Sequence, residues 1–330
     1  MADSTFVFLV GYGRSGSTLV HELLARHPDV GFVSNIEDRL PLRPAAGRYN
    51  NLLYRSVPPA LTRKGRPRYA PSEAYRALTR EVSPMIADSF RDLLAVDAMP
   101  WVADRLRWFF LERARVQGKP VFLHKFTGWP RAGLMQAVLP DARFIHIVRD
   151  PRAVVASDLQ ASWWRGYLGP EHLPIAPLPP AYAAEWEASG RSFAVLSAIA
   201  WKLTLDAHAA ARDALPASQW LDVRFEDVLA DPGSRFKEML DFMGLEGSEV
   251  FRRALARTTF RQDRVDAYRR QLDPGTLAAV ETCLAEHQRL AVPHGRVRSL
   301  SPSRRARRGG RRAARATDDR GRPRRQRRRR

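Results

Sequence analysis

The sequence predicts an α/β protein of three layers, α/β/α, with a central, mainly parallel sheet and a helical insertion. Short, nearly continuous apolar runs are typical of strands covered by helices on both faces, and four such runs stand beside helical stretches, at 6–10, 121–124, 144–148 and 220–223. The first run leads into a glycine-rich turn and then a helical apolar stripe at Leu19, Val20, Leu23 and Leu24. The order of strands and helices indicates an open, doubly wound sheet.

Changes in composition divide the chain. Residues 1–295 are expected to form the α/β domain, with 41–119 as a mostly helical, proline-interrupted insertion that shapes a binding pocket. The stretch 166–180 holds five prolines and predicts a loop or lid near the same edge of the sheet. Residues 296–330 are mostly Arg, Gly, Ala and Pro with little apolar content, so we expect a disordered tail.

The net charge of +20 is concentrated at one end of the chain. The tail holds 17 Arg against two Asp, which leaves 38 basic and 33 acidic residues before it, or +5. That balance suits a domain whose ligand is a polyanion. Cys283 is the single cysteine, which excludes an internal disulfide or a thiolate metal cluster and favours a cytoplasmic location. The apolar run 6–10 is too short to span a membrane.

A phosphate-binding loop is predicted directly after the first strand. Gly11 and Gly16 bracket four residues and are followed by Ser17 and Thr18, which is the spacing of a Walker A loop with serine in place of its lysine. Glycines let backbone N–H groups turn inward, and the start of the following helix favours an anion. The pattern predicts a phosphate cradle without the lysine of a nucleoside triphosphatase, although a merely tight strand–helix turn would have the same spacing.

The segments 14–19 and 27–30 together resemble the 5′-phosphosulfate-binding loop and following helix of the sulfotransferases that use 3′-phosphoadenosine 5′-phosphosulfate (PAPS). The resemblance is closest to the tyrosylprotein and carbohydrate branch. It implies a P-loop-like fold that lacks the Walker lysine, PAPS as co-substrate and no metal. It also implies that PAPS is bound by Gly13, Arg14, Ser15, Gly16, Ser17 and Thr18.

A second anion site is predicted where the strand ending at 148 meets a helix. Asp150 suits a helix cap and Pro151 a first turn, so Arg149 lies at the carboxyl end of a central strand and Ser157 on the helix. Taken alone, this segment favours the simpler interpretation that Arg149 caps the helix or pairs with Asp150. The family's 3′-phosphate motif is similar in residues and spacing, which implies that Arg149 and Ser157 hold the 3′-phosphate. The segment 223–228 resembles the family's late strand–helix signature, with Phe225 where tyrosine is usual.

The resemblance also implies catalytic roles. Lys125 ends a predicted strand and, with Arg14, is expected to stabilise the departing phosphate. The cytosolic branch has a histidine base two residues beyond this lysine, but Thr127 stands here. Glu37 resembles the glutamate of the tyrosylprotein branch and is the predicted general base, with Asp38 in reserve. The two carboxylates could instead be a surface pair neutralised by Arg39.

The predicted function is therefore transfer of a sulfuryl group from PAPS to a hydroxyl or amine of a small-molecule, glycan or peptide acceptor. Two alternatives stay open: an ATP-dependent P-loop kinase, which fits the glycine spacing but not Ser17, and a nucleic-acid-binding protein acting through the tail. The arginines of 296–330 would give non-specific, salt-dependent contact with polyanions, although the tail could equally be a compositional accident. Trp163 and Trp164 are candidates for stacking on an acceptor ring or for the core.

Overall fold

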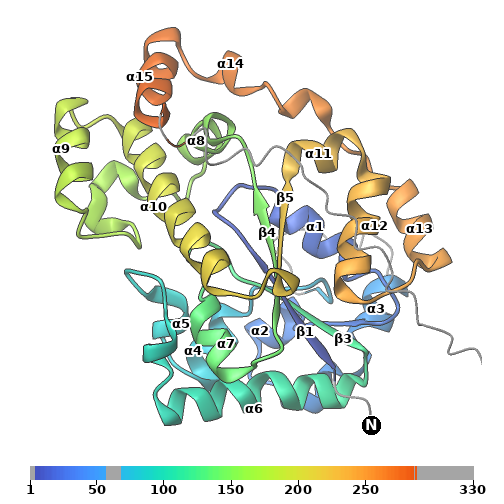
Figure 1. The fold of residues 1–330 in the computed structure, drawn as a ribbon. Helices are drawn as coiled ribbons and strands as arrows, with labels where there is room; N and C mark the ends of the chain where they lie inside the picture. Colours follow the sequence, from blue (N-terminus) through green and yellow to red (C-terminus); the bar gives the residue numbers. More distant parts are fainter. Residues whose placement is uncertain (1–3, 57–67, 286, 288–330) are drawn as a thin grey trace, which may run out of the picture. The chain divides into compact units, whose positions relative to one another are not determined.

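A parallel sheet of five strands forms the centre of the computed structural model, which describes residues 4–56, 68–285 and 287 (Figure 1). The strand order is β2-β3-β1-β4-β5, and every pairing is parallel. The strands are β1 (Thr5–Val10), β2 (Val30–Gly31), β3 (Val121–Lys125), β4 (Arg143–Val148) and β5 (Trp220–Arg224). The predicted α/β class and parallel sheet are thus confirmed.

The central strand β1 pairs with β3 on one side and with β4 on the other. Leu9 lies opposite Lys125 in one ladder and opposite Ile145 in the other. All three strands therefore end at the same edge of the sheet, and that edge carries the site. The two-residue edge strand β2 is too short to leave a periodic signal in the sequence, and it was not predicted.

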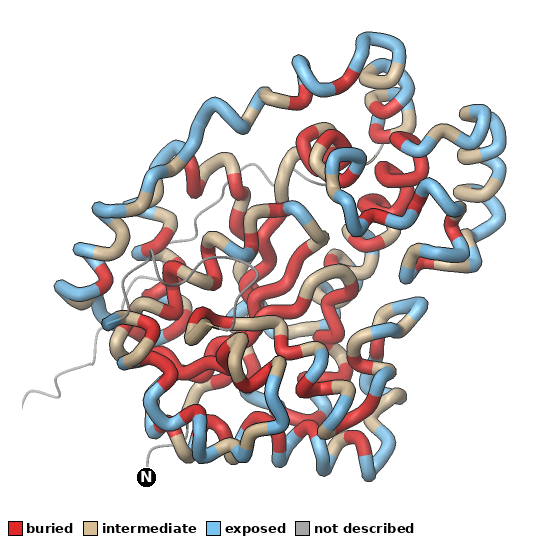
Figure 2. Tube along the Cα trace, turned by 180° about the vertical axis from the view of Figure 1, so that it is seen from behind, coloured by how far each residue is buried: buried red, intermediate tan, exposed pale blue. Residues whose placement is uncertain are grey.

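Alternate residues of the strands face two separate apolar cores, which accounts for the three layers. Phe6, Phe8 and Phe144 pack with helices α4 (Tyr75–Glu81), α6 (Pro100–Gln117) and α7 (Ala132–Val138) on one face. Val7, Leu9 and Ile145 pack on the other face with helices α1 (Ser17–Leu24), α11 (Phe225–Ala230), α12 (Pro232–Met243) and α13 (Glu249–Ala256). Figure 2 shows the strands as a buried band between exposed outer turns.

A helical group packs beyond the carboxyl end of β4. Helix α8 (Pro151–Leu159) begins with Asp150 as its cap, which accepts from the amide of Arg152. It packs against α10 (Phe193–Ala214) and α15 (Pro274–Leu284), and the three share a core that includes Trp201. The remaining elements in the second half of the chain are α9 (Pro180–Ala188), α14 (Tyr268–Gln271) and the 3-10 turns η4 (Gly166–Leu168), η5 (Pro170–His172), η6 (Ala217–Gln219) and η7 (Gln262–Arg264).

The described part of the predicted insertion is largely helical, with irregular stretches such as 68–74 and 89–94 between its helices. It contains η1 (Pro44–Tyr49), α3 (Asn50–Ser56), α4, α5 (Met85–Asp88), η3 (Ala95–Asp97) and α6, and it follows α2 (Asn35–Arg39). Residues 57–67 of the insertion and the predicted tail 296–330 lie outside the described residues. No helix among the described ranges is long and apolar enough to cross a membrane.

Candidate active site

The glycine-rich loop joins β1 to α1 at the edge of the sheet where β1, β3 and β4 end. Gly16 precedes the helix with φ 84°, a left-handed conformation that favours glycine, and a Cβ at this position would overlap the ring of Phe225. Arg14 also has a positive φ, 63°. The first amides of a helix have no intrahelical acceptor, so the loop presents donors to an anion. This geometry agrees with a phosphate cradle.

A cavity of about 730 Å³ opens on one side of this loop, and we call it the arginine cavity. Arg14, Arg149, Arg261, Arg264 and Arg270 contribute to its walls. Asp263 also lines it and forms an ion pair with Arg261, at 2.8 Å. Because the cations outnumber the carboxylate, the cavity suits a ligand that carries more than one negative charge.

The residues predicted for the 3′-phosphate lie together in the arginine cavity. The guanidinium of Arg14 donates to the hydroxyl of Ser157 at 2.7 Å, and Arg149 donates to the backbone oxygen of Arg14 at 2.8 Å. Burial lowers the pKa of Arg149, and the charge of Glu226 opposes that shift. The carboxylate of Asp150 binds Arg152, at 2.7 Å. Loop and helix α8 are therefore tied to each other at the predicted anion site.

Three arginines of the arginine cavity were missed in the sequence. Arg261, Arg264 and Arg270 follow α13, in a stretch whose short helices give little periodic signal. The backbone oxygen of Arg264 accepts from Arg149 at 3.4 Å, so the stretch lies directly against the predicted anion site. The high frequency of arginine between 252 and 270 could have indicated an anion-binding segment, but the tail contains far more arginine and accounts for most of the net charge.

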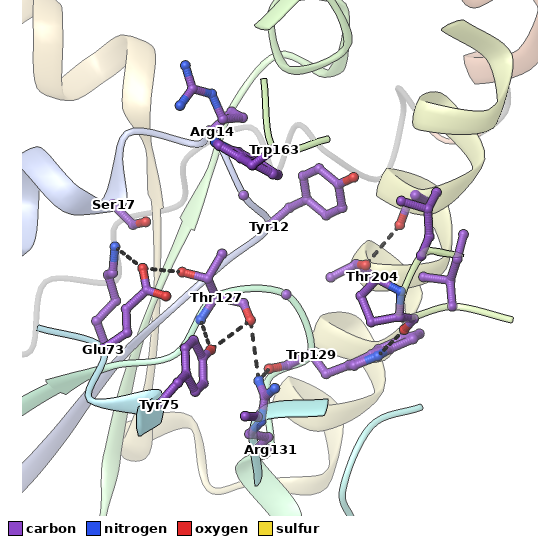
Figure 3. Close-up of a pocket in the computed structure, with 18 of the residues that line it drawn as sticks. Tyr12, Arg14, Ser17, Glu73, Tyr75, Thr127, Trp129, Arg131, Trp163 and Thr204 are labelled. Atoms are coloured by element: carbon purple, nitrogen blue, oxygen red, sulfur yellow. Dashed lines mark hydrogen bonds and ion pairs between the residues drawn. The ribbon is translucent and has the colours of Figure 1, made fainter. Parts of the chain in front are cut away.

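A second cavity, of about 460 Å³, lies on the other side of the phosphate loop (Figure 3), and we call it the aromatic cavity. Arg14, Ser17 and Thr18 line both cavities, so the two meet along the loop. The predicted insertion contributes three lining residues, which are Glu73, Tyr75 and Ala87. The aromatic cavity is also lined by Gly13, Tyr12, Trp129 and Trp163.

Lys125 and Glu73 form an ion pair at the junction of the two cavities. The ammonium of Lys125 lies 2.7 Å from the carboxylate of Glu73 and donates to the hydroxyl of Thr18 at 2.8 Å. Glu73 also accepts from the hydroxyl of Thr127 at 2.9 Å. In Figure 3, Glu73 and Thr127 lie at one end of the aromatic cavity, beside Ser17. A proton acceptor and a hydrogen-bond donor are thus placed side by side next to the phosphate loop.

Glu73 was missed because nothing in its sequence surroundings marks it. It follows Pro71 and Ser72 in the insertion, outside the segments that carry the family resemblance. Its backbone lies just before α4, where the isolated bridge between Ser34 and Pro71 brings the insertion back to the sheet edge. Only this tertiary return places the carboxylate opposite Lys125.

The structure does not bring Glu37 to either cavity. Its side chain is 2% exposed and caps α2, where it accepts from the amide of Ser34 at 2.9 Å. It also contacts the side-chain amide of Asn50 and lies 3.7 Å from the guanidinium of Arg113. Asp38 is buried as well and accepts from backbone amides at the start of α4. Both carboxylates therefore bind side chains or backbone amides of the insertion. Because both are buried, they are also not the exposed surface pair of the alternative prediction.

The remaining predicted residues divide between the loop and its supports. Ser15 is 1% exposed and lines a separate small cavity beneath the loop rather than either main cavity. Trp163 is exposed and lines the aromatic cavity, whereas Trp164 is buried against Phe193. His124 is packed among phenylalanine rings, and burial lowers its pKa to about 3, so it is a core residue.

A buried hydrogen-bond network lies behind the loop. The hydroxyl of Tyr12 donates to the carboxylate of Asp158 at 3.1 Å, and Ser197 donates to the same oxygen at 2.9 Å. Burial raises the pKa of Tyr12, and the charge of Asp158 raises it further. Burial also raises the pKa of Asp158 to about 6. The ring of Tyr12 faces the aromatic cavity while its hydroxyl is turned away into the protein (Figure 3).

Comparison with known proteins assigns the chain to a family. The model of the sulfotransferase family matches residues 7–249, and the chain belongs to that family. No curated protein sequence matches it. Solved structures with a similar fold include a sulfotransferase of Mycobacterium tuberculosis, at 18% identity and a TM-score of 0.51, covering 86% of this chain and 77% of that one.

Two further structures have the same fold. The sulfotransferase domain from the curacin biosynthetic pathway has 13% identity and a TM-score of 0.51, covering 86% of this chain and 98% of that one. A sulfotransferase of Mycobacterium avium has 15% identity and a TM-score of 0.50, with 88% and 77% covered. At these identities the likeness concerns the fold, and it agrees with the predicted P-loop-like α/β architecture.

Proposed function

We propose that this chain transfers a sulfuryl group from PAPS to a hydroxyl or amine of an acceptor bound in the aromatic cavity. The observation that carries the proposal is the Lys125–Glu73 pair, 2.7 Å apart, at the place where an arginine-lined cavity meets an aromatic one. An anionic donor and an apolar acceptor would meet at this pair. Membership of the sulfotransferase family supports the same reaction class.

The residues of the arginine cavity suit PAPS. Its 5′-phosphosulfate would lie on the loop formed by Gly13, Arg14, Ser15, Gly16, Ser17 and Thr18. Its 3′-phosphate would be held by Arg149 and Ser157, with Arg261, Arg264 and Arg270 as additional cations. Charge-assisted hydrogen bonds of this kind are about twice as strong as neutral ones. The proposal requires no metal, and no group of three potential ligands gathers among the described residues.

The proposed reaction is an in-line displacement at sulfur. The acceptor oxygen forms a bond to sulfur as the bond between sulfur and the 5′-phosphate oxygen breaks, and the electron pair of that bond stays on the phosphate. Lys125 and Arg14 donate to the departing oxygen. The ammonium of Lys125 has three donors, so it can do this while it keeps Glu73 and Thr18 as partners. Glu73 accepts the proton of the acceptor hydroxyl, in the role that the sequence had predicted for Glu37.

Calorimetry with nucleotides tests the donor. We expect adenosine 3′,5′-bisphosphate to bind at least about tenfold more tightly than AMP, because the 3′-phosphate adds hydrogen bonds between charged groups. Incubation with ³⁵S-labelled PAPS and a mixture of hydroxyl compounds should then label an acceptor. Tighter binding of ATP than of the bisphosphate would contradict the proposal and favour a kinase.

We expect this reaction to take place in the cytoplasm, because the chain has a single cysteine, the half-buried Cys283.

A further inference from the structure

The aromatic cavity changes in character from one end to the other. Glu73 and Thr127 lie at the end beside the phosphate loop, and Trp129 lies at the far end (Figure 3). Lys125 is paired with Glu73, and Ile175 and Ala200 line the same cavity and pack with Trp129. Trp129, Ile175 and Ala200 form one apolar cluster, which is backed by Leu173 and Leu178 and by residues of α10. An acceptor that fills the cavity must therefore present a hydroxyl at one end and an apolar body at the other.

The polar groups at the far end already have partners inside the protein. The indole N–H of Trp129 donates to the backbone oxygen of Pro174 at 2.7 Å, and the hydroxyl of Thr204 donates to the backbone oxygen of Ala200 at 2.8 Å. The hydroxyl of Tyr12 is held by Asp158. A sugar ring placed here would lose water from its hydroxyl groups and gain few hydrogen bonds, which costs free energy for each group.

The charges of the cavity also disfavour an anionic acceptor. Arg131 is buried, and its guanidinium donates to the backbone oxygens of Ile86 at 2.8 Å and Trp129 at 2.6 Å. Lys125 is paired with Glu73, and Arg14 is turned to Ser157 on the donor side. A sulfated glycan or an acidic peptide would meet the carboxylate of Glu73 and would have to compete for cations that already have partners.

Flat side chains surround the space that remains. Tyr12, Tyr75, Trp129 and Trp163 all line the cavity, and aromatic pairs add about 0.5–1.5 kcal/mol beyond the burial of their area. The hydrogen bond from Trp129 to Pro174 ties the loop after η5 across the far end. A volume of about 460 Å³ is within the range of small-molecule pockets.

On the basis of the proposed function, we infer that the acceptor is a small, uncharged aromatic compound with a phenolic hydroxyl. Its ring system would lie between the aromatic walls with its hydroxyl beside Glu73. A carboxylate base also suits a phenol, whose pKa is about 10 and lies well below that of an alkyl alcohol. Proton transfer to Glu73 is therefore less unfavourable from a phenol than from an alkyl alcohol.

The test compares acceptors with the full chain and ³⁵S-labelled PAPS. The compounds are 2-naphthol, cyclohexylmethanol, a glucosamine-containing oligosaccharide and an acidic peptide with one tyrosine. We expect kcat/KM for 2-naphthol to be at least about 100-fold above each of the others, which corresponds to about 2.7 kcal/mol. A higher kcat/KM for the alkyl alcohol, the oligosaccharide or the peptide overturns the inference.

Binding separates this inference from the proposed function. Calorimetry with adenosine 3′,5′-bisphosphate tests the donor site alone, and its failure contradicts the proposed function. Titration of 2-naphthol into the bisphosphate-bound protein tests the aromatic cavity without turnover. If the bisphosphate binds but 2-naphthol neither binds nor accepts label, the proposed donor stands and the inferred acceptor class is wrong.

Variants of the cavity wall complete the test. Trp163 is 59% exposed, so Trp163→Ala is expected to fold and to raise KM for 2-naphthol about tenfold, as loss of an aromatic anchor does. Ile175→Ala, in the apolar cluster with Trp129, should raise the same KM with KM for PAPS unchanged. Trp108→Ala, at a 53% exposed position on α6, is the matched control and should change neither. Unchanged KM for 2-naphthol in both cavity variants overturns the inference.

Discussion

The carboxylate of Glu73 lies 2.7 Å from the ammonium of Lys125, although the two residues are far apart along the chain. One group comes from the insertion and the other from the end of β3. In the proposed reaction they serve opposite partners, since Glu73 receives the acceptor's proton and Lys125 donates to the departing phosphate. In this proposal the contact therefore fixes how far the group that takes the acceptor's proton lies from the group that binds the departing phosphate.

Glu73→Gln should reduce kcat by about 10²–10⁴, the usual contribution of a general base. The amide keeps the shape of the side chain and its contact with Thr127 but cannot take up a proton. Affinity for adenosine 3′,5′-bisphosphate should change little. Glu112→Gln is the matched control, because Glu112 is an ion-paired glutamate of similar exposure that lies outside both cavities. A kcat equal to that of the unaltered chain would remove Glu73 from the mechanism.

Glu37→Gln should lower stability rather than chemistry. Glu37 is buried against Asn50 and Arg113, and a neutral amide leaves that guanidinium with Glu81 as its remaining carboxylate partner. A buried polar group that loses its partner costs about 1–3 kcal/mol. We expect a lower Tm in thermal unfolding, with kcat of the folded fraction unchanged. The reverse result, a normal Tm with a large loss of kcat, would return the role of base to Glu37.

Lys125→Ala should lower kcat by about 10²–10³, the effect of removing a donor aimed at developing charge. The affinity for adenosine 3′,5′-bisphosphate, which lacks the sulfuryl group, should be nearly unchanged in calorimetry. Lys202→Ala offers a comparison, because Lys202 is a buried lysine paired with a glutamate, Glu185, away from the loop. It should lower Tm and spare kcat. A Lys125→Ala variant that loses nucleotide affinity as strongly as kcat would contradict this role.

Arg149→Ala should act on donor affinity instead. Loss of a charged hydrogen-bond donor to the 3′-phosphate is expected to raise the Kd of adenosine 3′,5′-bisphosphate about 10–100-fold. The Kd of AMP should hardly change, because AMP lacks that phosphate. Arg152→Ala removes an ion-paired arginine that lies outside the arginine cavity, so it should leave both constants alone. Equal weakening of both nucleotides by Arg149→Ala would contradict a 3′-phosphate site.

Asp158→Asn tests the buried network behind the loop through its pH dependence. Burial holds the pKa of Asp158 at about 6, above its ordinary value of 3.8, and each unit is worth about 1.4 kcal/mol. Above pH 6 both the folded and unfolded forms are ionised, and the fold bears roughly 3 kcal/mol of unfavourable burial. Between about pH 4 and 6 the folded form holds the extra proton, so stability falls as pH rises.

Urea unfolding at several pH values measures this effect. Asp158→Asn should be more stable than the unaltered chain at pH 8, and the difference should disappear near pH 4. A variant that is less stable at pH 8 would mean that the ionised carboxylate contributes more through Tyr12 and Ser197 than burial costs.

The fold could be predicted because its strands are buried on both faces. Continuous apolar runs at 121–124 and 144–148 leave few other structures open, and the observed strands differ from them by one residue at an end. The edge strand Val30–Gly31 lacked such a run. Helix α6 lies in the stretch that was predicted to be mostly helical, but nothing local indicated where it begins or which face of the sheet it covers.

The donor side of the site was more predictable than the acceptor side. The phosphate loop and Arg149 stand directly after strands, so parallel topology brings them to one edge. The place of Glu37 after the first helix predicts a general base, but Ser34 followed three residues later by Glu37 is also the pattern of a capping box. Glu73 depends on how the insertion returns to the sheet, which no short-range pattern encodes.

Gly16 and Phe225 illustrate a restriction on how this site can change over evolutionary time. The ring of Phe225 occupies the space that any side chain at position 16 would need, so a substitution of Gly16 depends on the residue at position 225. A lineage that gains even a methyl group in the turn must first shrink the aromatic residue at the start of α11. Related sequences should accordingly retain glycine at the first position wherever the second carries a large ring.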